Sequence, residues 1–168
     1  EVTKEAASMI LGDDEFATIV DAVHRGRIIF DNIRKFMRYL LSSNMGEVVT
    51  VFMGIVCADL IGLSDAASTG GLAVPILAVQ ILWINLVTDT APALAMGVDP
   101  EVDEVMRRAP RRVDDAIIDR AMGVRILLMG LLMGVVSLLV LDLELPGGLI
   151  PGGGADLETA RTAAFTTL

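Results

Sequence analysis

Three long apolar stretches dominate the pattern of hydrophobic and polar positions along the 168-residue chain. They cover residues 39–63, 72–98 and 121–145, and each reaches the roughly 20 residues that a helix needs to cross a bilayer. A fourth stretch, 159–168, has about half that length. Before them, apolar positions at helical spacing lead into a basic segment, 23–38. The pattern predicts an all-α polytopic membrane protein: a helical stalk, three complete transmembrane helices and the start of a fourth.

Basic residues are distributed unevenly along the chain. Tyr39 to Met106 contains no Lys or Arg, and neither does the link 146–158, whereas the link 99–120 carries five arginines. Because cytoplasmic loops are enriched in Lys and Arg, we expect the stalk and the Arg-rich link to be cytoplasmic. The chain is then a multi-pass protein, which we expect in the plasma membrane.

The composition narrows the function classes and partners. Hydrophobic residues make up 54% of the chain and the net charge is −9, which excludes a nucleic-acid-binding protein because such proteins present a basic face. The single cysteine, Cys57, excludes a disulfide framework and a CxxC metal site. The expected partner is therefore the lipid bilayer, with no nucleic acid.

Polar residues lie inside two of the apolar stretches. Asn44 and Glu47 share one helical face in the first, and Asn85, Thr88 and Asp89 share one in the second. A charged side chain in mid-membrane costs roughly 2.5–3.5 kcal/mol, so each carboxylate needs a partner, a proton or a cation. Carboxylate, amide and hydroxyl oxygens are the ligands of hard cations such as Ca²⁺ or Mg²⁺. The five residues therefore predict a cation site.

Simpler interpretations of the same residues remain open at this point. Asn44 and Glu47 could form a polar clamp between helices, and the Thr88 hydroxyl could bond its own helix backbone. Pro92 lacks a backbone N–H and weakens the second helix just after Asp89. A helix broken there would expose carbonyl oxygens beside an ion site, as in many transporters.

Several motifs together resemble a known family. The runs SSNMGEVV, ILWINLVTDTAPALAMGVDP and VMRRAPRR occur in order and resemble type II P-type cation-transporting ATPases, especially the calcium-pump branch. The resemblance covers nearly the whole chain and implies the following segments: the end of the phosphorylation domain (1–22), the stalk (23–38), family helix five (39–63), helix six (72–98), a cytoplasmic loop (99–120), helix seven (121–145), an outer loop (146–158) and the start of helix eight (159–168).

The resemblance also implies roles for individual residues. Asn44 and Glu47 match cation ligands of helix five, whereas Asn85, Thr88 and Asp89 match ligands of the unwound helix six. Small residues, namely Gly46, Gly130 and Gly134, match the packing between helices five and seven. Thr90 departs from the family, because many members have Gly there and unwind more freely.

The implied activity belongs to a longer parent protein. The transported cation would be Ca²⁺, and Mg·ATP would bind only in the parent, because the sequence contains neither the phosphorylated-aspartate motif nor a nucleotide-binding domain. We therefore expect this chain to be inactive alone, with the remaining pump domains and helices as its partners. Two alternatives stay open: a non-enzymatic membrane scaffold or regulator, and a pump for another cation (Na⁺/K⁺, H⁺ or Mn²⁺).

Overall fold

The computed structural model describes residues 5, 7, 10, 12, 15–67, 73–101, 104–111, 116–150 and 153–168. Parts of the predicted segments 1–22, 99–120 and 146–158, and the first residue of the predicted span 72–98, lie outside these described residues. Within them the regular structure is entirely helical, which confirms the predicted all-α class.

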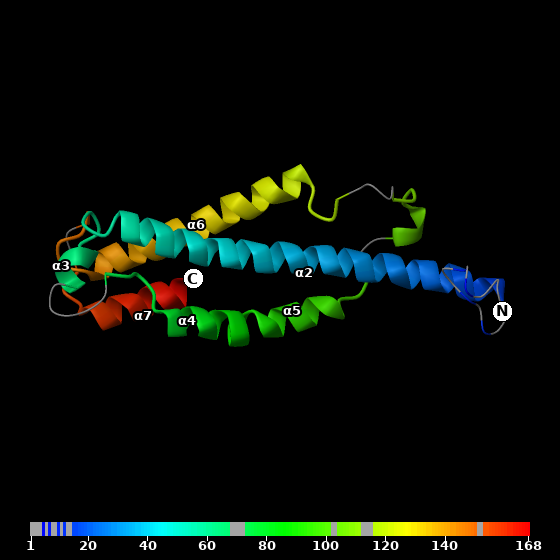
Figure 1. The fold of residues 1–168 in the computed structure, drawn as a ribbon, viewed down its shortest axis with the longest axis horizontal. Helices are drawn as coiled ribbons and strands as arrows, with labels where there is room; N and C mark the ends of the chain where they lie inside the picture. Colours follow the sequence, from blue (N-terminus) through cyan, green and yellow to red (C-terminus); the bar gives the residue numbers. More distant parts are fainter. Residues whose placement is uncertain are drawn as a thin grey trace.

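Helix α2 is the longest element. It runs without interruption over Phe16–Val56, a total of 41 residues. At 1.5 Å per residue it is about 60 Å long, roughly twice the thickness of a bilayer's hydrocarbon core. One helix thus contains both the segment predicted as a stalk, 23–38, and most of the span predicted at 39–63 (Figure 1).

The second apolar stretch forms a helix in three parts. Helix α4 (Ala78–Trp83) leads into a π-helical turn, η1 (Ile84–Thr88), and after Asp89 the chain continues as α5 (Thr90–Gly97). The sequence suggests a break before Pro92, but the structure instead widens the helix by one residue per turn.

Two hydrogen bonds characterise the π-helical turn just before the proline. The N–H of Asp89 donates to the carbonyl of Ile84, five residues back, at 2.9 Å. The Thr90 hydroxyl donates to the carbonyl of Leu86 at 2.6 Å. Such π-helical turns occur frequently at functional sites because they redirect side chains without ending the helix.

The remaining elements complete the bundle. Helix α6 spans Arg120–Glu144, and Asp119 caps its start by accepting the N–H of Met122 at 2.7 Å. Helix α7 spans Leu157–Thr167. Two short helices lie in the connections: α3 (Leu63–Ala67) and the 3₁₀ turn η2 (Val105–Arg107).

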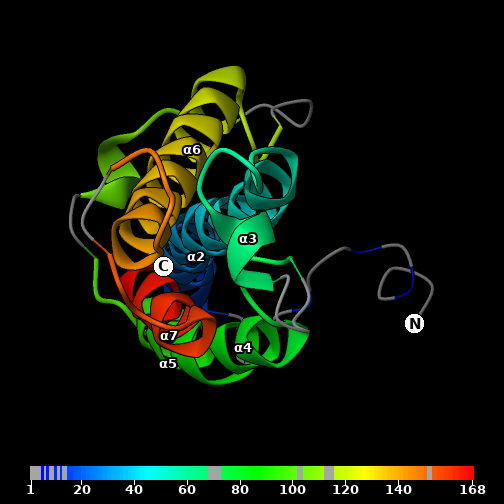
Figure 2. The same cartoon turned by 90° about the vertical axis from the view of Figure 1, so that its left-hand side faces the viewer.

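Helix α2 lies between α6 on one side and α4 and α5 on the other (Figure 2). Helices α2 and α6 approach most closely at two glycines. A Cβ atom on Gly130 would lie 2.5 Å from Cγ of Met45, and one on Gly134 would lie 2.5 Å from Cγ1 of Val49. The expected small-residue packing between these helices is therefore confirmed, since no larger side chain fits at either position.

A buried apolar cluster holds together the end of the molecule where α2 ends and α7 begins. Its members come from the turn after α2, from α3, α6 and α7: Ala58, Ile61, Leu63, Leu141, Leu145, Ala160 and Ala164. The hydroxyl of Ser137 on α6 also donates to the carbonyl of Ala164 at 2.9 Å. The opposite end, where α2 begins and the described residues of the link 99–120 lie, is called the basic end below.

Three helical segments are long and apolar enough to cross a membrane: α2, the combined segment Ala78–Gly97, and α6. Large apolar side chains on α6, among them Leu128 and Leu132, are more than half exposed. Exposure of this kind is expected where lipid rather than water covers a helix.

Candidate cation site

One face of α2 carries polar side chains at intervals of four residues, namely Tyr39, Ser43 and Glu47. This spacing places them one above the other on a helix surface. Glu47 is only 5% exposed. The face is directed toward η1 and α5, because its polar atoms contact residues of that helix.

Asn85 in the π-helical turn contacts Glu47 directly. Its Nδ2 donates to Oε2 of Glu47 at 2.8 Å and to the carbonyl of Ile81 at 3.0 Å. Both donated protons are on the amide nitrogen, so the amide oxygen of Asn85 remains available as a ligand.

Asp89 is the second buried acid and is 3% exposed. Its Oδ1 accepts two hydrogen bonds from the polar face of α2, from the Tyr39 hydroxyl at 3.3 Å and from the Ser43 hydroxyl at 3.2 Å. Both bonds are long for O–H···O⁻ contacts, which are usually shorter than 2.8 Å. The carboxylate is therefore oriented but not saturated.

Two carboxylate oxygens in this group have no hydrogen-bond partner among the described residues. They are Oε1 of Glu47 and Oδ2 of Asp89, and both are fully buried. An unsatisfied buried acceptor costs free energy, and a charged one costs more than a neutral one. Two such oxygens on facing helices can be satisfied together by a cation between them.

The structure places the other two predicted ligands at the margin of this group. Thr88 lines a cavity together with Asp89, and its side chain is exposed. Asn44 is half-buried, and its amide makes no hydrogen bond within the part of the chain that the structure describes. On a helical wheel it lies about 60° from Glu47, on the side away from α6. Both residues stay predicted ligands.

Two cavities adjoin Asp89. The larger, of about 820 Å³, lies between α2, η1, α6 and α7, and is called the central cavity below. The other, of about 620 Å³, lies between α2 and α5 and is mainly apolar. Asp89 thus lies between an apolar groove and a wider space that also contains polar and basic side chains.

The charge of the site suits a hard cation. Within the described residues no three His, Cys, Asp or Glu side chains lie close enough to hold a metal ion. The group instead combines two carboxylates with neutral oxygens from Asn85, Thr88 and the hydroxyls of α2. That donor set is typical of Ca²⁺ and Mg²⁺ and lacks the nitrogen and sulfur ligands that Zn²⁺ and Cu⁺ favour.

The sequence interpretation missed Tyr39 and Ser43. Their signal was present, because they precede Glu47 by eight and four residues and so share its face. Hydroxyl groups in apolar helices are common, however, and most bond their own backbone, as Ser42 does with the carbonyl of Arg38 at 2.8 Å.

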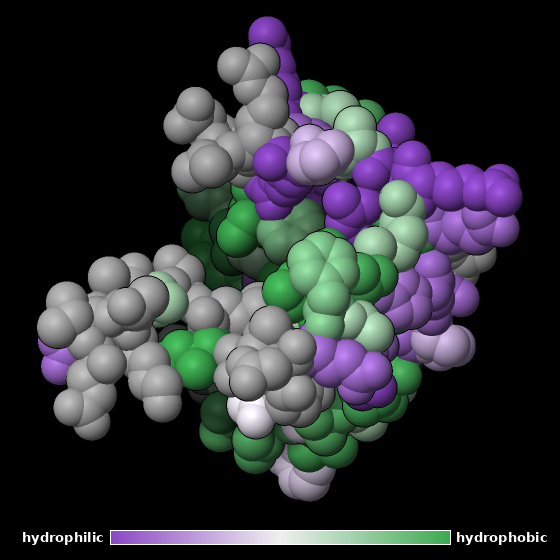
Figure 3. Space-filling view, turned by 90° about the vertical axis from the view of Figure 1, so that its right-hand side faces the viewer, coloured by the Kyte–Doolittle hydropathy of each residue, from purple (hydrophilic) through white to green (hydrophobic). Residues whose placement is uncertain are grey.

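Contacts at the basic end connect the site-bearing helices. Asn32 on α2 donates to the carbonyl of Asp99, just after α5, at 2.8 Å, and Lys35 pairs with the Asp99 carboxylate at 2.6 Å. Hydrophilic side chains gather over the upper and right part of this end, and hydrophobic ones lie along its lower edge (Figure 3). Polar contacts therefore fix the end of α5 against α2.

Two acids at the basic end have lowered pKa values. The pKa of Glu101 lies below its ordinary value because the carboxylate accepts the backbone N–H of Val105 and a hydrogen bond from His24. The pKa of Asp119 is lowered chiefly by the backbone N–H of Met122 that it caps. Both carboxylates stay ionised where an unperturbed acid would begin to protonate.

Comparison with known proteins gives a consistent result. A family model described as "Cation transporting ATPase, C-terminus" matches residues 73–168. A calcium-transporting ATPase of Bacillus subtilis (strain 168) is 39% identical over 168 residues, which is 100% of this chain and 17% of that protein. An endoplasmic reticulum-type calcium-transporting ATPase 2 of Arabidopsis thaliana is 42% identical over 139 residues, 82% of this chain and 12% of that protein. A calcium-transporting ATPase of Plasmodium falciparum is 39% identical over 137 residues, covering 82% and 10% respectively. The chain thus spans less than one fifth of the length of these relatives.

Proposed function

Because the chain belongs to the family of cation-transporting ATPases and matches their C-terminal region, we propose that it forms the membrane-embedded cation-binding part of an ATP-driven calcium pump. Calcium is proposed as the transported ion because the relatives named above are calcium-transporting ATPases. The oxygen-only donor set at Glu47 and Asp89 supports the same choice.

A single observation carries the proposed site: Oε1 of Glu47 and Oδ2 of Asp89 are buried on facing helices without a partner among the described residues. We propose these two oxygens as the anionic ligands. The amide oxygen of Asn85 joins them, because its nitrogen already donates to Glu47. Thr88, which lines the same cavity as Asp89, and Asn44 are proposed as outer ligands.

ATP hydrolysis is assigned to other parts of the parent protein. No residue of this chain is proposed to bind Mg·ATP, so the chain's own contribution is to hold and release the ion. Helix α2 joins the basic end to Glu47 without a break. Movement of that end can therefore shift the protein between two conformations that bind the ion with different affinity.

The proposed orientation places the basic end in the cytoplasm. Helix α2 is about twice as long as a bilayer's hydrocarbon core is thick, and its basic half lies on the same side as the Arg-rich link. We propose the plasma membrane as its location, and fractionation of cell membranes tests this against an internal membrane.

Neutral variants of the two acids test the proposed ligands. In the complete parent pump we expect Glu47→Gln and Asp89→Asn each to lower the apparent Ca²⁺ affinity at least about 100-fold, because each removes one charge-assisted ligand worth roughly 3 kcal/mol. The measurement is the Ca²⁺ dependence of phosphorylation from ATP.

Glu144→Gln serves as the matched control, since it neutralises an acid at the far end of α6. Its Ca²⁺ dependence should equal that of the unchanged protein. Wild-type Ca²⁺ dependence in both the Glu47 and Asp89 variants would remove the ligand assignment. If phosphorylation responded to another cation but never to Ca²⁺, the assignment of Ca²⁺ as the transported ion would be wrong, while the assignment of the ligands would stand.

A further inference from the structure

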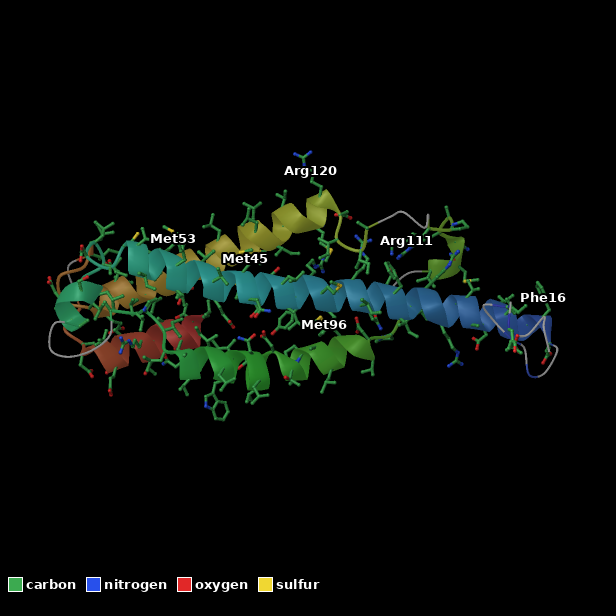
Figure 4. All side chains as sticks on the ribbon, viewed as in Figure 1. Phe16, Met45, Met53, Met96, Arg111 and Arg120 are labelled. Carbon is green, nitrogen blue, oxygen red and sulfur yellow. The ribbon has the colours of Figure 1, made fainter. Side chains whose placement is uncertain are left out.

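Helices α2 and α6 diverge toward the basic end. They touch at Gly130 and Gly134, and from there α6 leans away until Arg120 lies well separated from α2 (Figure 4). A cavity of about 420 Å³ lies in this opening, bounded by α2, by the link after α5 and by the first turns of α6. We call it the interhelix cavity.

Most charged side chains that line the interhelix cavity are already paired. The pairs are Arg34 with Asp119, Arg108 with Asp31, Lys35 with Asp99, and Glu101 with His24, at nitrogen–oxygen distances of 2.6–2.8 Å. Two lining residues are left over, and both are arginines: Arg38 on α2 and Arg125 on α6. Neither guanidinium group forms a hydrogen bond or an ion pair with any part of the chain that the structure describes, although the Asp119 charge acts on Arg125 at longer range.

These two guanidinium groups face the same space from two helices. A guanidinium is planar and carries five N–H donors, so it matches phosphate oxygens in a bidentate geometry. Two unpaired guanidinium groups around one cavity therefore favour a doubly hydrogen-bonded phosphate over a carboxylate or a small halide.

The depth of the site in the membrane indicates what kind of phosphate it receives. Arg38 directly precedes the base-free stretch that begins at Tyr39, and Arg125 lies a little more than one turn into α6. Apolar side chains beside Arg125 are exposed, Val124 by 50% and Leu128 by 59%. A headgroup at the arginines would thus have an apolar helix surface along which its acyl chains can lie.

We propose that Arg38 and Arg125 bind the phosphate of an anionic phospholipid, and that the bound headgroup tunes the entry of the cation to Asp89. The second part rests on the proposed function; the first does not. Both arginines also line the central cavity that contains Asp89. Their positive charge opposes a cation in that cavity, and a bound phosphate cancels it.

Lipid binding is tested on the complete protein in phosphatidylcholine nanodiscs that contain a minor fraction of photoactivatable phosphatidylglycerol. No ATP or Ca²⁺ is added, so the result does not depend on transport. We expect cross-linking to α2 and α6, lowered about fivefold by Arg38→Gln and by Arg125→Gln, since each substitution removes a hydrogen-bonding partner of the phosphate worth about 1 kcal/mol. Arg120→Gln is the control, because Arg120 lies on the same helix outside the cavity.

Charge-conserving variants separate loss of binding from loss of fold. Arg38→Lys and Arg125→Lys should retain most of the labelling and the elution profile of the unchanged protein. Equal labelling in the Gln variants and in the unchanged protein would overturn the site. If millimolar inorganic phosphate displaced the lipid label, the site would belong to a soluble anion, and the proposal of a lipid ligand would be overturned.

Cation entry is tested in the same nanodiscs. Replacing phosphatidylcholine partly by phosphatidylglycerol should raise the apparent Ca²⁺ affinity of phosphorylation about threefold in the unchanged protein and not in the Arg38→Gln, Arg125→Gln double variant. A lipid that binds without changing the affinity would overturn the regulatory part alone. Complete absence of Ca²⁺-dependent phosphorylation would contradict the proposed function and leave the lipid site standing.

Discussion

The two oxygens of the Asp89 carboxylate are in different situations. Oδ1 accepts hydrogen bonds from the hydroxyls of Tyr39 and Ser43, whereas Oδ2 is buried and has no partner in the part of the chain that the structure describes. The hydroxyls thus fix the plane of the carboxylate and leave the other oxygen to a ligand. In this arrangement α2 supplies one acid and also orients the acid of the neighbouring helix.

Removing one hydroxyl should weaken the site without abolishing it. We expect Ser43→Ala to lower the apparent Ca²⁺ affinity of phosphorylation about threefold to tenfold, because one modest hydrogen bond to the carboxylate is lost. Ser42→Ala is the matched control, since the Ser42 hydroxyl bonds the backbone carbonyl of Arg38 and not Asp89. Equal effects of the two substitutions would contradict an orienting role for Ser43.

The acids of the candidate site could be singled out from the sequence, and their hydroxyl partners could not. Glu47 and Asp89 stand out because a charge in an apolar stretch is costly and demands an explanation. Ser42 and Ser43 are adjacent and chemically identical, yet one bonds its own helix and the other bonds Asp89. Only the rotation of α2 relative to α5 distinguishes them, and that rotation is a property of packing.

Among the helices, the contact between α2 and α6 depends on glycine. At Gly134 an added Cβ would lie 2.5 Å from Cγ1 of Val49 and 3.2 Å from the backbone nitrogen of Thr50. The backbone atom cannot move aside as a side chain can. The two helices would have to separate, which would also shift Glu47 relative to Asn85.

Gly134→Ala is therefore expected to destabilise the protein by about 1–3 kcal/mol through overpacking. Gly123→Ala is the control on the same helix, because nothing lies within 4 Å of its added Cβ. It should be neutral or slightly stabilising, since Ala favours a helix more than Gly does. The measurement is the unfolding midpoint in a detergent titration, and equal midpoints for the two variants would argue against the close contact.

The helix formed by the second predicted span shows that a residue's own helix preference does not always decide whether a helix continues. Pro92 removes a backbone donor, and from that alone a break in the helix follows. The structure nevertheless keeps the helix: the N–H of Asp89 bonds five residues back to Ile84, and just beyond the proline the N–H of Ala93 again bonds four residues back, to Asp89. The sequence shows that a donor is missing; it does not show that the turn before the proline becomes π-helical.

On the scale of the whole molecule, the basic end should loosen in acid. The pKa values of Glu101 and Asp119 are lowered in the folded protein. A lowered folded pKa contributes stability that is present above the ordinary pKa and is lost as the pH falls through the folded value. The contacts between α2 and the link after α5 should thus persist at pH 6 and weaken below the ordinary carboxyl pKa of 4.5.

Pulsed electron paramagnetic resonance checks this expectation. Spin labels at Gly26 and Met106, in a Cys57→Ser background, should give a narrow distance distribution at pH 6 and a broad one in acid. Glu101→Ala should broaden the distribution already at pH 6, with less further change as the pH falls. A distribution that stays narrow below the ordinary carboxyl pKa would show that these carboxylates do not hold the link.

The three spans and the fold class were predictable, because length and hydropathy alone decide whether a helix can cross a bilayer. The residue at which α2 ends could not be predicted from hydropathy. The helix stops at Val56, although the apolar stretch continues to Leu63. The turn that follows includes Gly62 at a φ of +70°, where a Cβ atom would lie 2.9 Å from the carbonyl oxygen of Pro146, a neighbour that hydropathy does not reveal.

The position of Glu47 on α2 has a mechanical consequence. Gly130 and Gly134 contact α2 at Met45 and Val49, on either side of Glu47. If α2 moves as a rigid helix, it therefore pivots about this contact. A tilt of about 5° about it would move the Phe16 end by about 4 Å and Glu47 by almost nothing. A rotation of α2 by about 20° around its own axis would instead carry the Glu47 carboxylate about 2 Å sideways, away from Asn85. The site is therefore insensitive to leaning of the stalk and responsive to its twist, so a motor that acts through α2 must deliver torque.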